Sequence, residues 1–201
     1  MPDLKSNVWK MYLFKFLISF LLVNGVWVPF YMEYGGLSFF QMMVLESLFM
    51  FSLMLLTVPA GAFADLIGRK KALGLSAFLF IISVGAYGLA PSFSLFIAAN
   101  FLWAMGFSLE QNAELAMVYD SLKCTGKERS SKPIISRLRS FEYAGFMISA
   151  PLGSMLAERV GLRAVMFLTA IPLILCLVVP LFLKEPPKKR KIGIGYFQQI
   201  K

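Results

Sequence analysis

The residues best suited to chemistry in this sequence are two glutamates, Glu110 and Glu114, which stand four positions apart in an otherwise apolar segment. Four positions are close to one turn of an α-helix, so both carboxyl groups would lie on one face. Carboxylates at that spacing repel each other, which favours carriage of a proton by the pair. The chain has no histidine, so imidazole relays, Ser-His-Asp triads and His-ligated metals are excluded.

Other polar and aromatic residues share this helical face. At 100° per residue the face is a stripe about 100° wide, and it consists of Asn100, Trp103, Phe107, Glu110, Gln111 and Glu114. An ionised side chain in the middle of a bilayer costs roughly 3 kcal/mol, so we expect the stripe to line a substrate or proton cavity. The alternative is that both glutamates are structural and are satisfied by Ser, Asn or Lys groups on neighbouring helices.

Two further segments carry polar residues inside apolar runs. Asn24 and Gly25, followed by Pro29, interrupt the first run; they either line a substrate cavity or allow a local bend. Glu46 lies in the outer half of the second run and is a candidate for a second acid in the cavity.

The segments that position these residues are those of an all-α membrane protein. The chain has 201 residues, of which 58% are hydrophobic and 15% charged, with a mean hydropathy of +0.71. Because a spanning helix needs about 20 apolar residues, the sequence predicts six transmembrane helices. They cover residues 11–31, 39–64, 72–90, 93–119, 140–157 and 162–183 within a bundle at 1–184, and a basic cytoplasmic linker follows at 185–201.

The distribution of basic residues predicts the orientation of these helices. Eighteen of the 20 basic residues, Lys15 among them, fall before, between or after the segments on one side, and Arg159 and Arg163 fall on the other. The positive-inside rule then places both termini in the cytoplasm of a multi-pass protein of the cell membrane. The excess charge therefore indicates topology in a lipid bilayer, and we expect no nucleic-acid partner. Arg139 and Glu142, three residues apart, are expected to pair locally.

The turn between the second and third segments, at residues 61–71, reads Gly-Ala-Phe-Ala-Asp-Leu-Ile-Gly-Arg-Lys-Lys. Gly68 suits the sharp turn that joins two adjacent spans. Asp65 comes at the C-terminal end of a helix, where the helix dipole is negative, so its carboxylate needs a compensating cation or the N-terminus of another helix.

This turn resembles the signature of the major facilitator superfamily, G-x-x-x-D-x-x-G-R-[KR]-[KR]. The matching positions are Gly61, Asp65, Gly68, Arg69, Lys70 and Lys71. The segments Val58-Pro59-Ala60-Gly61 and Val118-Tyr119-Asp120-Ser121-Leu122 are similar to those of a drug-transporter-like prokaryotic subgroup. The resemblance implies a conformational gate in which Arg69 pairs with Asp120 and Asp65 faces a helix of another half. The membrane arginine and the Gly-Pro signature of the proton antiporters are not retained, the latter being reduced to Ala150-Pro151-Leu152-Gly153-Ser154.

The resemblance also implies a function. Members of the family consist of two six-helix repeats with the substrate between them, so this chain would be the N-terminal half of a secondary active transporter. It would move a small solute by alternating access coupled to protons, and carboxylates would be the proton carriers because the chain has no histidine. The second six-helix half would be a missing C-terminal half or another copy acting in a homodimer, and the alternative is a non-transporting membrane partner or assembly module. We expect no enzyme activity, cofactor or metal.

Overall fold

The computed structural model describes residues 4–89 and 91–187, and the regular structure in these residues is helical. In chain order the helices are α1 (Lys5–Ser19), η1 (Leu22–Gly25), α2 (Trp27–Pro29), η2 (Phe30–Tyr34), α3 (Phe39–Ile67), α4 (Arg69–Leu89), α5 (Phe93–Cys124), η3 (Glu128–Ser130), α6 (Ser131–Val160), α7 (Leu162–Leu168) and α8 (Ala170–Phe182). Most of the predicted linker, residues 188–201, lies outside the described residues, as does Ala90.

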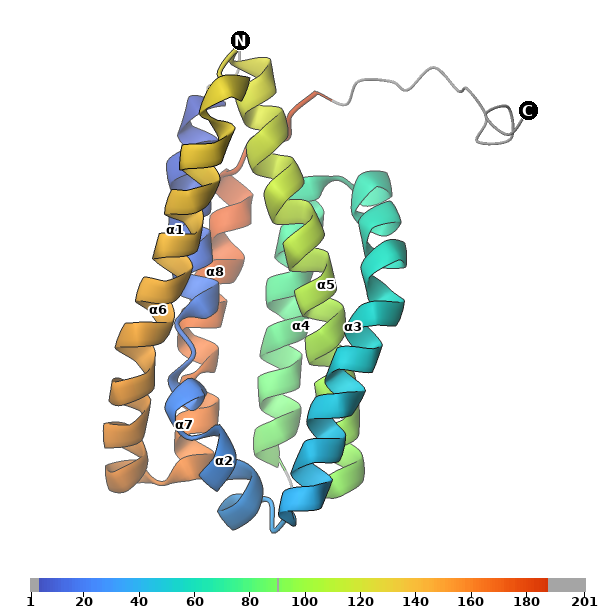
Figure 1. Cartoon of the computed structure of the whole chain (residues 1–201). Helices are drawn as coiled ribbons and strands as arrows, with labels where there is room; N and C mark the ends of the chain where they lie inside the picture. Colours follow the sequence, from blue (N-terminus) through green and yellow to red (C-terminus); the bar gives the residue numbers. More distant parts are fainter. Residues whose placement is uncertain (1–3, 90, 188–201) are drawn as a thin grey trace, which may run out of the picture.

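The helices form two groups (Figure 1). One contains α1, α6, α7 and α8, and the other contains α3, α4 and α5; α4 packs on α8 and α5 packs on α1 where the groups meet. The start of α1, the turn between α3 and α4, the connection between α5 and α6 and the end of α8 all lie at the same end of the bundle. This end carries the basic residues of the connecting segments.

Short polar residues and glycines set the ends of the long helices. Ser38 caps α3 through a reciprocal pair of hydrogen bonds with Gln41, and Ser92 accepts a hydrogen bond from the Leu95 amide at the start of α5. Gly68 separates α3 from α4 with a φ of 99°, a conformation that favours glycine. The predicted second, third and fourth segments therefore appear as α3, α4 and α5, with α5 extending past 119 to Cys124.

The first predicted segment, 11–31, is not one continuous helix. The α-helix ends at Ser19, a single 3₁₀ turn follows at Leu22–Gly25, and the chain continues through α2 and a π-type turn to Tyr34. Interrupted backbone at membrane depth is tolerated where it is buried in protein or lines a cavity. The 3₁₀ turn of the break packs on α6 and α7.

Glycines allow α6 to approach this break very closely. A Cβ on Gly153 would collide with the carbonyl oxygen of Leu22, and a Cβ on Gly25 would collide with that of Ala150. Nearer the start of α6, a Cβ on Gly145 would lie 2.8 Å from the carbonyl oxygen of Phe16. The part of α6 at residues 150–154 therefore packs closely on the first segment.

Four of the six predicted spans are long and apolar enough in the described residues to cross a membrane: Phe39–Ile67, Arg69–Leu89, Phe93–Cys124 and Leu162–Phe182. The first segment falls short because α1 has only 15 residues. The fifth, α6, is 30 residues long and begins at Ser131, nine residues before the predicted start, and it is richer in glycine, serine and charge. The last span is divided at Thr169 into α7 and α8.

Candidate functional site: a buried charge cluster beside an aromatic cavity

The two glutamates singled out by the sequence share one cation, which comes from the first helix. The ammonium nitrogen of Lys15 lies 2.7 Å from Glu110 Oε1 and 2.8 Å from Glu114 Oε2. All three side chains are buried, with 2%, 2% and 0% of each residue exposed. Because a buried charge is costly unless it is paired, Lys15 is the counterion that allows both acids to lie inside the bundle.

Helix α6 completes the cluster. Glu142 Oε1 lies 3.3 Å from Lys15 Nζ, and Glu142 Oε2 lies 2.7 Å from Arg139 Nη1. Arg139 Nη2 also lies 3.7 Å from Glu114 Oε1. The cluster therefore joins α1, α5 and α6 with three carboxylates and two cations. With every member ionised it carries one excess negative charge, which one proton or one monovalent cation would neutralise.

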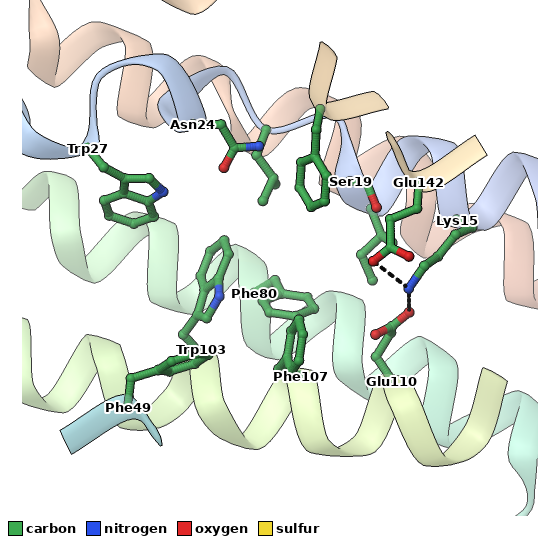
Figure 2. Close-up of a pocket in the computed structure, with 13 residues that line it drawn as sticks. Lys15, Ser19, Asn24, Trp27, Phe49, Phe80, Trp103, Phe107, Glu110 and Glu142 are labelled. Carbon is green, nitrogen blue, oxygen red and sulfur yellow. Dashed lines mark hydrogen bonds and ion pairs between the residues drawn. The ribbon is translucent and has the colours of Figure 1, made fainter. Parts of the chain in front are cut away.

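A cavity of about 190 Å³ begins at this cluster and extends along the interface between the two groups of helices. Figure 2 shows Lys15, Glu110 and Glu142 at one end and Trp27 toward the other, with the rings of Phe80, Trp103 and Phe107 between them. The lining consists of Lys15, Ile18, Ser19, Leu21, Asn24, Trp27, Phe49, Phe80, Trp103, Phe107, Glu110, Glu142 and Phe146. Ligand pockets usually measure about 300–1,000 Å³, so this cavity holds a small solute or part of a larger one.

The aromatic rings of the wall contact one another edge to face. The Trp27 and Trp103 centroids are 6.0 Å apart with an interplanar angle of 88°, and the Phe80 and Trp103 centroids are 4.6 Å apart at 62°. These pairs link the first segment, α4 and α5 through apolar surface. The faces and edges of such rings suit a planar apolar body or a cation.

The break in the first segment borders the same cavity. Ser19, Leu21, Asn24 and Trp27, which flank or occupy the break, all line it. The side-chain nitrogen of Asn24 is buried and has no hydrogen-bond partner among the described residues. Since buried polar groups are nearly always satisfied, this donor is available to a solute in the cavity.

The structure divides the predicted stripe on α5. Phe107 and Glu110 line the cavity, and Glu114 lies behind them in the charge cluster. Asn100 is buried, and its amide donates to the Leu45 carbonyl of α3 at 3.2 Å. Gln111, also a member of the stripe, is exposed. Neither of these two residues is part of the described lining.

Glu46 also lies apart from the described lining of this cavity, on an exposed face of α3. The lining acid that the sequence did not predict is Glu142, which reaches the cavity from α6.

Arg69 is the centre of the motif between α3 and α4. Its Nε lies 2.9 Å from Asp120 Oδ2 at the end of α5, and its Nη2 lies 3.3 Å from Asp65 Oδ1. The pairing of Arg69 with Asp120 that the resemblance implies is thus present. Asp65 receives a cation from its own motif, which compensates its position at the end of α3.

Gly61 and Lys70 of the motif contact two other helices. Gly61 faces the Asn112 side chain of α5, whose oxygen would lie 3.1 Å from a Cβ at this position; Asn112 in turn donates to the Thr57 carbonyl at 3.1 Å. Lys70 Nζ donates to the Leu181 carbonyl of α8 at 2.7 Å. The motif therefore contacts α5 and α8 as well as joining α3 to α4.

Two members of the cluster were misjudged from the sequence. Lys15 was counted with the basic residues that indicate topology, but it is buried between three carboxylates. Arg139 and Glu142 do pair locally, yet Glu142 also contacts Lys15 and lines the cavity. The signal that could have identified Lys15 is its place between Phe14 and Phe16 in an apolar run, where a charge needs a partner.

Comparison with known proteins agrees with the motif. The family model of the Major Facilitator Superfamily matches residues 11–197, a range that contains the charge cluster, the cavity and the turn at 61–71. A lincomycin resistance protein from Streptomyces lincolnensis is 30% identical over 128 residues. That alignment spans 64% of this chain and 25% of the relative, so the chain covers about a quarter of that protein's length.

Proposed function

Because the chain belongs to the major facilitator superfamily, we propose that it acts in secondary active transport, moving a small solute across the cytoplasmic membrane by alternating access coupled to protons. Because it belongs to this family, the chain is a multi-pass membrane protein related to transporters. The observation that carries the more specific proposal is the junction of a charge cluster with an aromatic cavity between two groups of helices.

Proton coupling is supported by the composition of the cluster. Glu110 lines the cavity and is held by Lys15, while Glu114 and Glu142 compete for the same ammonium group. A protonated carboxylate no longer competes for the ammonium group, so Lys15 pairs with the remaining carboxylates. The same proton removes the excess negative charge of the cluster. The cluster can therefore exchange a proton for a cationic group of the solute without leaving an uncompensated charge in the bundle.

The aromatic walls of the cavity and the excess negative charge of the cluster favour an organic cation with an apolar ring as the solute. Asn24 would supply a hydrogen-bond donor to an acceptor on the same molecule. The name of the relative, a lincomycin resistance protein, supports export of an antibiotic-like compound. Lincomycin is therefore one suitable probe, and ethidium, a fluorescent aromatic cation, is another.

The gate in this proposal is formed by the motif at the turn. Arg69 connects Asp65 on α3 to Asp120 on α5, so it ties two helices whose ends would separate when this side of the bundle opens. Gly68 permits the turn, and Gly61 permits contact with α5. Breakage of the Arg69 pairs would accompany each transport cycle.

The orientation proposed is with both termini in the cytoplasm. Basic residues gather at the end of the bundle that holds the turn between α3 and α4 and the connection between α5 and α6, whereas Arg159 and Arg163 lie at the other. The positive-inside rule assigns the first of these ends to the cytoplasm.

A second six-helix unit, on the same polypeptide or on another copy, would complete the translocation path. Only 11% of the most apolar stretch of α3 is buried. Glu46 lies on the exposed side of this helix. A charge on that side favours a protein or water-lined surface over lipid. Glu46 would then belong to the cavity between the two units.

The test is transport by purified protein in proteoliposomes with an imposed pH gradient. Ethidium and radiolabelled lincomycin flux are measured for wild type, for Arg69→Ala and Glu110→Gln, and for Glu128→Gln as a matched surface control. We expect flux in wild type and the control and a loss of at least tenfold in the other two. Equal flux in all four proteins, or none in any, would contradict the proposal.

The second candidate is a non-transporting membrane partner or assembly module. The observation in its favour is that Lys15 and Arg139 already satisfy the glutamates inside the chain, as a purely structural cluster requires. Under this function Glu110→Gln would leave binding to the partner intact while no flux is observed in proteoliposomes.

A further inference from the structure

The segment directly after α8 is hydrogen-bonded to the ends of two other helices, α1 and α4. Phe182, Leu183, Lys184 and Glu185, here called the 182–185 clasp, follow or close α8 at the end of the bundle that carries the gate motif. The sequence places Glu185 at the first position of a basic linker, but in the structure its side chain is directed into the turn between α3 and α4.

Glu185 binds the backbone of the gate. Its Oε1 accepts a hydrogen bond from the Arg69 amide at 2.7 Å, and its Oε2 accepts one from the Lys70 amide at 2.8 Å. These amides are the first two of α4, which have no partner within their own helix. A carboxylate there is favoured by the helix dipole and by two charge-assisted hydrogen bonds.

The site is shaped for this contact by Gly68. A Cβ at Gly68 would lie 3.1 Å from Glu185 Oε1, closer than an ordinary van der Waals contact. The glycine of the motif thus has a second use besides its positive φ of 99°, because it leaves room for the carboxylate.

The other side of the clasp is connected to the helix of Asp120 through Asn7 of α1. Asn7, fully buried in α1, donates to the Lys184 carbonyl at 2.7 Å and accepts from the Lys184 amide through Oδ1 at 3.0 Å. The same Asn7 amide donates to Ser121 Oγ at 3.0 Å. Ser121 follows Asp120 directly, so Asn7 of α1 connects the clasp to α5, the helix that carries the acid paired with Arg69.

We propose that Glu185 is a positioning residue for the gate: it holds the backbone of Arg69 so that the guanidinium lies between Asp65 and Asp120, and thereby couples the segment after α8 to opening at this end. Arg69 then interacts with three acids, two through its side chain and one through its amide. The coupling to opening rests on the proposed function, whereas the contact with the α4 amides does not.

The first measurement is hydrogen–deuterium exchange of full-length protein in nanodiscs, in wild type, Glu185→Gln, Glu185→Asp and the surface control Glu128→Gln. In Glu185→Gln we expect exchange of the amides at residues 69–72 to accelerate at least tenfold, with the interior of α4 unchanged. Glu185→Asp, which keeps the charge, restores part of the protection. Unchanged exchange at 69–72 would overturn the clasp, whether or not the chain transports anything.

The second measurement reports opening without a substrate. Ser19, which lines the cavity, is replaced by cysteine in a Cys124→Ser, Cys176→Ser background, and its labelling by a water-soluble methanethiosulfonate is timed. Glu185→Gln should change the labelling rate at least threefold, and Glu128→Gln should not. Faster exchange at 69–72 with an unchanged labelling rate would show a merely structural contact and would overturn the coupling to the gate.

Discussion

Removal of Lys15 is the perturbation to which the structure assigns the largest effect. In Lys15→Met, three carboxylates that now lie 2.7, 2.8 and 3.3 Å from the ammonium nitrogen lose their shared cation. Loss of one partner from a buried ion pair costs about 3–5 kcal/mol. For a chain of this size each kcal/mol lowers the melting temperature by about 2–4 °C, so a decrease of roughly 6–20 °C is expected.

The assay is thermal unfolding of the detergent-solubilised protein followed by intrinsic tryptophan fluorescence, since Trp27 and Trp103 border the cavity. Lys71→Met removes an exposed lysine of α4 and is the matched control, with an expected change below about 0.5 kcal/mol. The double variant Lys15→Met with Glu110→Gln should recover stability, because it removes opposite charges together. A melting temperature for Lys15→Met equal to that of the control, or additive effects in the double variant, would refute the assignment of Lys15 as the counterion.

Three further changes test other parts of the structure. Gly153→Ala should destabilise the protein by about 1–3 kcal/mol through a clash with the Leu22 carbonyl, as measured by the same unfolding assay. The control Gly85→Ala, where a Cβ meets nothing within 4 Å, should be neutral or stabilising. Equal effects of the two substitutions would count against the close approach of α6. Asn24→Ala should raise the KM for lincomycin flux at least threefold with little change in stability, because the oxygens of lincomycin can accept a hydrogen bond from this donor. An unchanged KM would remove this donor from the solute site. Glu110→Gln should make any residual flux independent of the pH gradient, and a preserved gradient dependence would remove Glu110 from coupling.

The parts of the fold that follow from local chemistry were predictable. Ser38, Gly68 and Ser92 mark helix ends through capping and positive φ, and the apolar runs between them are long enough to cross a membrane. The family resemblance likewise implied that Arg69 and Asp120 would pair, and they do. These features depend on short stretches of sequence.

The features that depend on contacts between distant segments were not predictable in the same way. The first helix ends at Ser19, five residues before Asn24, and the break that follows packs closely on glycines of α6 that are more than 100 positions away. Lys15 meets acids that are 95 and 99 positions away in the chain. In the sequence Glu185 resembles an ordinary linker residue, and only the structure shows that it contacts the start of α4.

The most direct test of the charge cluster as the coupling site is the number of protons moved for each solute molecule. Proteoliposomes with a trapped pH dye are given an ethidium gradient, and proton and ethidium fluxes are recorded together. One excess negative charge in the cluster predicts about one proton exchanged per monovalent cation, and Glu110→Gln should abolish the proton flux while Glu128→Gln preserves it. Ethidium flux without proton flux in wild type, or full proton flux in Glu110→Gln, would contradict this account.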